Sequence, residues 1–302
     1  MGAHHHHHHH HHRGAAAAFR WSVLLNALLT GAQLAIGFGF GSLALIGDAI
    51  HNLGDVVGLL LAWGAERLSL RPARGRFTYG YGRSTHLAAL INGLLVFGAG
   101  LLVVVEGLDR LQQPEPLVAG PVAVAAAAGI AINLLSARLF GADADLDLNR
   151  RAAVLHLLSD AAVSAAVLLS AILVALTGRT ELDAITAIAV GAAVMVSAYG
   201  LLKQALAASL DAVPEGQDLQ LIEAALRGLP GVMAVSELHV WGLGGRRVAL
   251  TAHLQVQGVP AANLLRLGEE RLRELGIEHS TCLLYTSPSP RDRTRSRMPS
   301  SA

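Results

Sequence analysis

The sequence predicts an integral membrane protein with a six-transmembrane-helix bundle followed by a small α+β domain. Two observations lead to this prediction. Hydrophobic residues make up 53% of the chain and charged residues only 15%, whereas soluble domains carry about 25% charged residues. Six apolar stretches also reach the length of about 20 residues that a helix needs to cross a bilayer. A more polar region, residues 214–282, follows them.

Both ends of the chain are set apart from this fold. Nine of the 15 histidines form an unbroken run over residues 4–12, so residues 1–14 are interpreted as an expression tag. Residues 283–302 lack periodicity and are rich in Ser, Pro and Arg, which is typical of vector-derived sequence. The chain between them is expected to form a transmembrane domain, 15–209, and a cytoplasmic domain, 210–282.

The predicted spans are separated by breaks rich in glycine, proline or charge. Their expected boundaries are 17–40, 43–68, 84–108, 117–140, 152–176 and 183–206. Five arginines lie at or between the second and third spans and three between the fourth and fifth, against one in each of the third and fifth connections. Because basic residues favour the cytoplasmic side of a membrane, both termini are expected in the cytoplasm.

The polar region after the last span changes its periodicity several times. Apolar and polar residues alternate over 248–256, and a period of two predicts a half-buried strand. A second strand is expected at 232–241 and a third from Glu278. The amphipathic stretches 217–229 and 262–275 predict helices. The order helix, strand, strand, helix, strand predicts a small α+β sandwich.

Histidine and aspartate recur four residues apart in two of the predicted spans. His51 and Asp55 lie in the second span, and His156 and Asp160 in the fifth. Positions i and i+4 share one face of a helix, so each pair can direct two ligands to one place. Two imidazoles and two carboxylates complete the tetrahedral shell that Zn²⁺ favours. The sequence therefore predicts a divalent metal site within the membrane.

A packing or hydrogen-bonding role is the alternative for any one such pair. An aspartate at the centre of a membrane helix costs about 2.5–3.5 kcal/mol on insertion scales, and a cost that recurs at matched spacing favours function. The single cysteine, Cys282, excludes an internal disulfide and a cysteine-based metal cluster. The chain has no His-Glu-x-x-His run and no recognisable nucleophile, so an enzyme is not expected.

These features resemble the cation diffusion facilitator family, in its zinc-transporting branch, over about residues 16–282. Besides the two His-x-x-x-Asp pairs, the resemblance rests on Phe77-Thr78-Tyr79-Gly80-Tyr81-Gly82-Arg83 and Leu238-His239-Val240-Trp241. It implies a ferredoxin-like, metallochaperone-like cytoplasmic domain, a homodimer, and a location in the bacterial inner (plasma) membrane. It also implies a transport site made by His51, Asp55, His156 and Asp160. Divalent metal ions, protons, lipid and a second copy are the expected partners, and nucleic acid is not.

The resemblance further implies export of Zn²⁺ in exchange for protons. Histidine binds metal only when neutral, and its unperturbed pKa is about 6.5, so metal and protons compete for such a site. Histidine in both pairs favours Zn²⁺, with Cd²⁺ and Co²⁺ as companions, while ligand chemistry alone does not exclude Ni²⁺. The alternatives are an exporter selective for Cd²⁺, Co²⁺ or Ni²⁺, and a membrane metal sensor that transports nothing.

Three further sets of residues have two interpretations each. Asp48 is either an outer acceptor for an imidazole N–H or a hydrogen-bonding group at the helix entrance. The resemblance implies that Arg83 and Asp211 form a charge pair at the dimer interface, and the alternative is two solvated charges. It also implies regulatory Zn²⁺ in the cytoplasmic domain, at positions where ordinary surface residues are equally expected: Glu237, His239, His253 and His279.

Overall fold

The computed structural model describes residues 11–141, 148–245 and 247–286. Most of the expected tag and of the expected vector-derived tail therefore lies outside the described residues. The chain forms two compact units, Met1–Ala62 with Ala89–Leu202, and Trp63–Ala88 with Lys203–Ala302. Each unit is described by itself.

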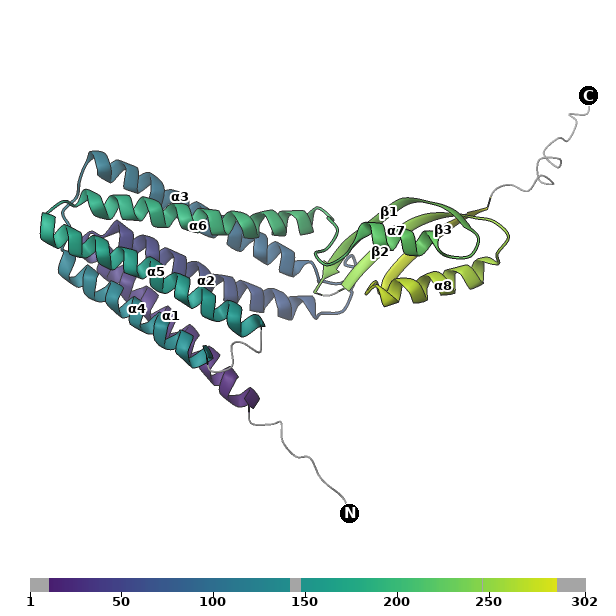
Figure 1. Cartoon of the computed structure of the whole chain (residues 1–302), viewed down its shortest axis with the longest axis horizontal. Coiled ribbons are helices and arrows are strands. Elements are labelled where there is room, and N and C mark those ends of the chain that lie inside the picture. The colour runs from purple at the N-terminus through teal and green to yellow at the C-terminus, as the bar shows by residue number, and fades with distance from the viewer. Residues whose placement is uncertain (1–10, 142–147, 246, 287–302) are drawn as a thin grey trace, which may run out of the picture. The chain divides into compact units, whose positions relative to one another are not determined.

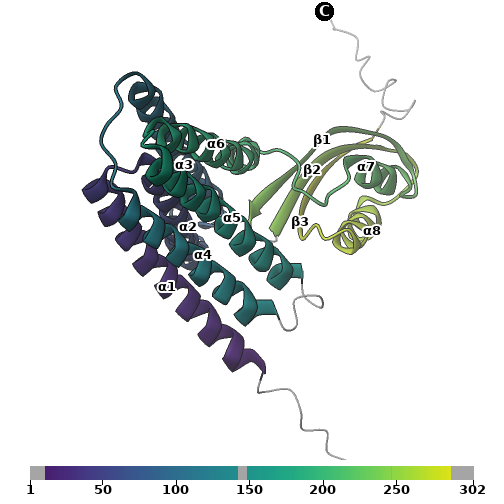
Figure 2. The same ribbon diagram turned by 60° about the vertical axis from the view of Figure 1, so that its left-hand side comes forward.

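Six long helices precede the sheet (Figure 1). They are α1 (His11–Phe40), α2 (Leu43–Ser69), α3 (Ser84–Gln112), α4 (Ala119–Gly141), α5 (Leu148–Thr177) and α6 (Glu181–Ser209). Within the described residues, α2 to α6 are long and apolar enough to cross a membrane, and α1 contributes a shorter apolar stretch, Leu24–Phe40. The predicted six-helix membrane fold is confirmed. Figures 1 and 2 both show α1, α4 and α5 side by side.

The N-terminal end of α2 is capped by a carboxylate from another helix. Asp183, at the start of α6, accepts hydrogen bonds from the Leu43 and Ala44 backbone N–H groups at 2.7 and 3.1 Å. It also accepts one from the Ser42 hydroxyl at 2.6 Å. The first N–H groups of a helix have no partner within the helix, and the macrodipole there favours an anion. Asp183, only 4% exposed, supplies both the acceptor and the charge.

Glycines bring α3 and α6 close together. Gly93, Gly100 and Gly107 recur every seventh residue of α3, and all three are buried. A Cβ at Gly100 would lie 3.1 Å from the Gly191 carbonyl oxygen of α6, and one at Gly191 would lie 3.0 Å from the Gly100 carbonyl oxygen. Membrane helices pack closely where small residues let their backbones approach. The α3–α6 contact thus depends on the missing side chains.

Gly100→Ala should destabilise the membrane unit by about 1–3 kcal/mol, because the added methyl group overpacks the contact with α6. Gly98→Ala is the matched control, since a Cβ there meets nothing within 4 Å and alanine favours helix by up to about 1 kcal/mol. The thermal unfolding midpoints of the two purified variants in detergent would check this. Equal midpoints would show that α3 and α6 do not need the close approach.

The cytoplasmic domain contains α7 (Leu219–Arg227), β1 (Val232–Gly244), β2 (Arg247–Val256), α8 (Ala261–Glu274) and β3 (His279–Thr286). The sheet order is β1-β2-β3, with β2 antiparallel to β1 and parallel to β3. Both helices pack on one sheet face (Figure 2), where Ile222, Leu226, Leu264 and Leu272 meet the apolar set of β2. This confirms the predicted α+β domain, including the period of two in β2.

Two elements extend into the chain ends that the sequence set apart from the fold. Helix α1 begins at His11, inside the expected tag, rather than at residue 17. Strand β3 continues to Thr286, so the first four residues of the expected vector-derived tail, 283–286, pair with β2. Parallel pairing needs only backbone groups and an apolar inward face, and Leu284 meets this condition because it packs against the domain core.

Candidate metal site in the membrane helices

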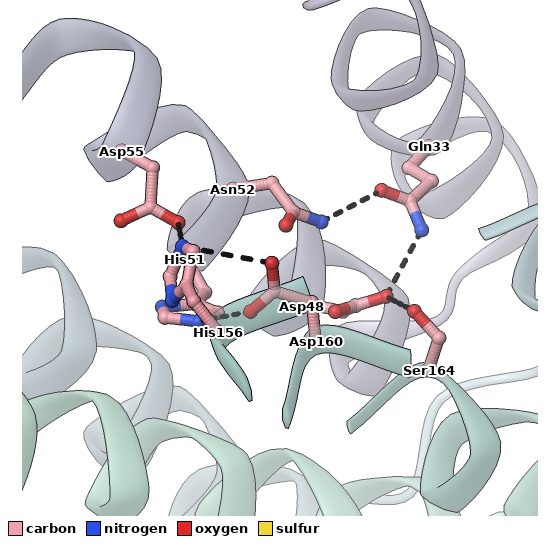
Figure 3. A network of polar contacts seen from close by, with 8 residues as sticks. All are labelled: Gln33, Asp48, His51, Asn52, Asp55, His156, Asp160 and Ser164. Carbon is pink, nitrogen blue, oxygen red and sulfur yellow. Dashed lines mark hydrogen bonds and ion pairs between the residues drawn. The ribbon is translucent and has the colours of Figure 1, made fainter. Parts of the chain in front are cut away.

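The two predicted His-x-x-x-Asp pairs meet where α2 faces α5 (Figure 3). His51 Nε2 lies 3.2 Å from Asp160 Oδ1, and His156 Nε2 lies 3.2 Å from Asp55 Oδ2. Each histidine therefore contacts the aspartate of the opposite helix. His156 Nε2 is also 3.7 Å from Asp160 Oδ2, so Asp160 approaches both imidazoles. The helical spacing places two ligands on each helix, and the packing of α2 on α5 joins the two sets.

The ligand atoms of His51, Asp55 and Asp160 all lie within 4.8 Å of one another. His156 falls outside this tightest group but stays in contact with both aspartates. Asp160 is 3% exposed, whereas the His156 side chain is 49% exposed. Asp160 is therefore shielded from solvent, whereas His156 is accessible to it. Two imidazole nitrogens and two carboxylates in this arrangement suit a four-coordinate divalent ion such as Zn²⁺.

Asp48 belongs to a separate hydrogen-bonded network. Its Oδ2 accepts hydrogen bonds from Gln33 Nε2 at 2.9 Å and from the Ser164 hydroxyl at 2.8 Å. Asn52 Nδ2 donates in turn to Gln33 Oε1 at 3.4 Å. Among the described residues, neither imidazole donates to Asp48, so the expected outer-acceptor role is not what the geometry gives. Both Asp48 and Gln33 are fully buried.

The sequence interpretation missed Gln33 and Ser164. Ser164 follows Asp160 by four residues, so the same i, i+4 rule that paired the ligands also placed it one turn further along that face. Gln33 is a large amide in an apolar helix, which would have been sufficient reason to examine it. The glycine at position 129 of α4 borders both, since a Cβ there would lie 2.9 Å from Ser164 Oγ and 3.1 Å from Gln33 Nε2.

Arg83 and Asp211 form the expected ion pair, in which the guanidinium of Arg83 donates to Asp211 Oδ1. Both side chains are about half exposed. Asp211 has a positive φ of 61°, a conformation that is uncommon outside glycine but tolerated better by aspartate than by most residues. The contact joins the start of α3 to the segment after α6 within one unit of the chain.

The four residues proposed for a cytoplasmic site do not converge within one chain. The sheet face opposite the helices carries three of them, His239, His253 and His279. His253 is one of the residues of β2 that alternate with its core residues, and His239 and His279 pair with Thr251 and Ala249 of the same set. Within the described part of the chain, the only contact that joins two of the four is that of His239 Nε2 with Glu237 Oε2, at 3.4 Å, and the cluster of metal-ligating groups found there includes none of them. Cys282 packs against the domain core, on the other sheet face from the three histidines, and burial raises the pKa of its thiol.

Comparison with known proteins assigns the chain to a family. Residues 20–208 match the cation efflux transmembrane domain, and residues 214–282 match the cytoplasmic domain of cation efflux proteins. The chain belongs to the cation diffusion facilitator family. The predicted family is therefore confirmed, and its two domains coincide with the bundle and the α+β domain described above.

Relatives of this cation diffusion facilitator cover most of its length. The zinc transporter ZitB of Escherichia coli strain K12 is 36% identical over 83% of this chain and 82% of its own. The cation efflux system protein CzcD of Alcaligenes sp. strain CT14 is 35% identical over 77% of this chain and 75% of its own. The cadmium, cobalt and zinc/H(+)-K(+) antiporter of Bacillus subtilis strain 168 is 32% identical over 85% of this chain and 84% of its own.

Proposed function

We propose that this protein is a proton-coupled antiporter that exports Zn²⁺ from the cytoplasm through the site of His51, Asp55, His156 and Asp160. The observation that carries the proposal is the meeting of two imidazoles and two carboxylates from α2 and α5. Ionisable residues inside membrane helices are costly and mark ion pathways. The names of the relatives, which include zinc transporters and a cadmium, cobalt and zinc antiporter, support Zn²⁺ as substrate and Cd²⁺ and Co²⁺ as companions.

Proton coupling follows from the chemistry of the same ligands. An imidazole binds a metal ion only in its neutral form, so Zn²⁺ binding weakens as the pH falls through the histidine pKa, about 6.5 when unperturbed. A site that faces the cytoplasm and the exterior in turn would bind Zn²⁺ at the higher pH and release it at the lower. The arginine-rich connections support cytoplasmic termini. The direction of export is supported by the relatives, one of which is named as a cation efflux system protein.

Zn²⁺ flux into proteoliposomes that contain a metal-sensitive dye would test the proposal. With the membrane potential clamped, an interior more acidic by one pH unit should support about tenfold accumulation of Zn²⁺ for each proton exchanged, since one pH unit corresponds to about 1.36 kcal/mol. An alkaline interior should oppose uptake, and protein-free liposomes are the control. Uptake that is indifferent to the sign of the pH gradient would rule out proton coupling.

A metal sensor that transports nothing is the second candidate from another class. It would bind Zn²⁺ at the membrane site without flux in the same liposomes. The depth of the site among apolar helices favours transport, because a sensor has no need to hold ligands there. Selectivity for Cd²⁺, Co²⁺ or Ni²⁺ in place of Zn²⁺ is the alternative within transport, and competition of each ion with Zn²⁺ uptake would reveal it.

We also propose a homodimer, with the Arg83–Asp211 pair near its interface and regulatory Zn²⁺ on the cytoplasmic domain. The match to the cytoplasmic domain of cation efflux proteins supports a shared arrangement of this domain. Since Glu237, His239, His253 and His279 do not converge in one chain, a cytoplasmic Zn²⁺ site would need ligands from a second copy or a bridging water. The homodimer would be visible in the mass of the detergent-solubilised protein.

A further inference from the structure

The polar groups where α2 faces α5 include one more carboxylate than a divalent ion can neutralise. Asp48, Asp55 and Asp160 supply three negative charges, and the histidines that bind metal are neutral. A Zn²⁺ ion bound by Asp55 and Asp160 would balance two of these charges and leave Asp48. Among the described residues no arginine, lysine or histidine forms an ion pair with Asp48, although a buried charge is retained only when it is paired.

The surroundings of Asp48 differ in chemical class from the metal site. Its neighbours in the network are two amides and a hydroxyl, from Gln33, Asn52 and Ser164. All three are at least nine-tenths buried. The atoms with which these side chains can bind a cation are all oxygens, because their amide nitrogens act only as hydrogen-bond donors. Oxygen ligands suit hard cations, whereas the imidazoles of the other site suit Zn²⁺. A single carboxylate among neutral oxygens matches a single positive charge.

One oxygen of Asp48 is available to such a cation. Oδ2 accepts two hydrogen bonds, but Oδ1 is buried and has no hydrogen-bond partner among the described residues. Figure 3 shows the Asp160 carboxylate between the two imidazoles and the Asp48 carboxylate. An amide presents its oxygen in place of its nitrogen after a half turn of its last torsion.

The helix packing leaves room for this cluster. Gly129 of α4 borders it, and a Cβ at that position would press on both Ser164 Oγ and Gln33 Nε2. The cluster is therefore assembled from four helices, with Gln33 on α1, Asp48 and Asn52 on α2, Gly129 on α4 and Ser164 on α5. Most of these groups satisfy one another by hydrogen bonds, but Asp48 Oδ1 has no partner among the described residues, and an unsatisfied buried polar atom is costly inside a membrane.

We propose that Asp48, Gln33, Asn52 and Ser164 form a second cation site, which binds an alkali-metal ion such as Na⁺ or K⁺ beside the Zn²⁺ site. The alkali-metal ion neutralises the third carboxylate, and Asp160 separates it from the divalent ion. The two cations repel each other across Asp160, so entry of one lowers the affinity for the other. The site thereby gives the transporter a second ion to exchange. This last consequence rests on the proposed function, but the binding itself does not.

Equilibrium binding of radioactive sodium and rubidium, the latter as a K⁺ analogue, to the purified full chain in detergent would test the site. The measurement is made without any divalent metal and with choline chloride holding the ionic strength constant. Saturable binding approaching one ion per chain is expected for the intact protein. Absence of saturable binding of either ion to the folded intact protein would overturn the proposal and assign the charge balance to a proton.

Three variants locate the binding. Asp48→Asn should weaken alkali-ion binding at least tenfold, and Gly129→Ala should weaken it by crowding the cluster without removing a ligand. Asp55→Asn is the matched control on the same helix, because it removes a Zn²⁺ ligand and should leave alkali-ion binding intact. Equal alkali-ion binding by Asp48→Asn and the intact protein would contradict the proposal. Failure of Zn²⁺ flux with alkali-ion binding retained would instead count against the transport function alone.

Discussion

Replacing Asp160 by asparagine should lower the affinity for Zn²⁺ by at least about 100-fold and abolish Zn²⁺ flux. Loss of a group that only supports a ligand costs about 10–100-fold in metal affinity, and Asp160 is proposed as a ligand itself. It is also the group that approaches both imidazoles, at 3.2 and 3.7 Å. Its removal therefore takes away one ligand and the contact that orients two others. Isothermal titration of the purified full chain with Zn²⁺ would measure the affinity.

The matched control for Asp160→Asn is Glu106→Gln. Glu106 is a carboxylate on α3 that pairs with Arg110 at 3.3 Å and is half exposed, so the variant loses the same charge away from the site. It should keep the Zn²⁺ affinity of the intact protein. Zn²⁺ that Asp160→Asn still binds would be divided among the three remaining membrane ligands, the histidine run at 4–12 and the proposed cytoplasmic site. Unchanged affinity and flux in Asp160→Asn would show that transport does not use this group of residues.

Replacing Asp183 by alanine should destabilise the membrane unit by about 3–9 kcal/mol. The variant leaves two backbone N–H groups and one hydroxyl without their hydrogen-bond acceptor, and each buried group without a partner costs about 1–3 kcal/mol. Because Asp183 is only 4% exposed, water has little access to replace the lost acceptor. The fraction of protein that stays monodisperse after heating in detergent would record the loss.

Asp183→Asn removes the negative charge at this position but keeps a hydrogen-bond acceptor. The asparagine carbonyl oxygen can still accept from α2, so this variant should lose less stability than alanine. Identical unfolding temperatures for the intact protein and Asp183→Ala would contradict the assigned cap. Because Asp183 lies on α6 and the metal ligands lie on α2 and α5, neither variant removes a proposed ligand.

The sequence predicted those features that depend on local pattern. Apolar length was sufficient to find the six helices, and the i, i+4 spacing was sufficient to place His51 with Asp55 and His156 with Asp160 on shared faces. The alternation in β2 likewise identified which side chains enter the domain core. In each case the information lies within a single element, so it can be extracted without knowing how the elements pack.

Features that depend on how helices rotate against one another were not predicted. Gln33 and Asp48 are separated by one helix connection, and Ser164 lies more than a hundred residues further along, so their contact appears only after α1, α2 and α5 have packed. The Asp183 cap spans 140 residues in the same way. The proposed cytoplasmic ligands show the same limit from the other side. The period of two along the strands places three histidines on one face of the sheet, but it does not bring them together at one point.

The Asp183 cap fixes the rotational phase of α2 as well as its end. His51 lies eight residues from Leu43, about 12 Å along the axis at 1.5 Å per residue, and each residue turns the helix by about 100°. An alanine inserted between Ala44 and Asp48 would leave the cap and the His-x-x-x-Asp spacing unchanged. It would nevertheless turn His51 and Asp55 together by about 100°, away from α5. The metal site therefore depends on the number of residues between the cap and the ligands as strictly as on the ligands themselves.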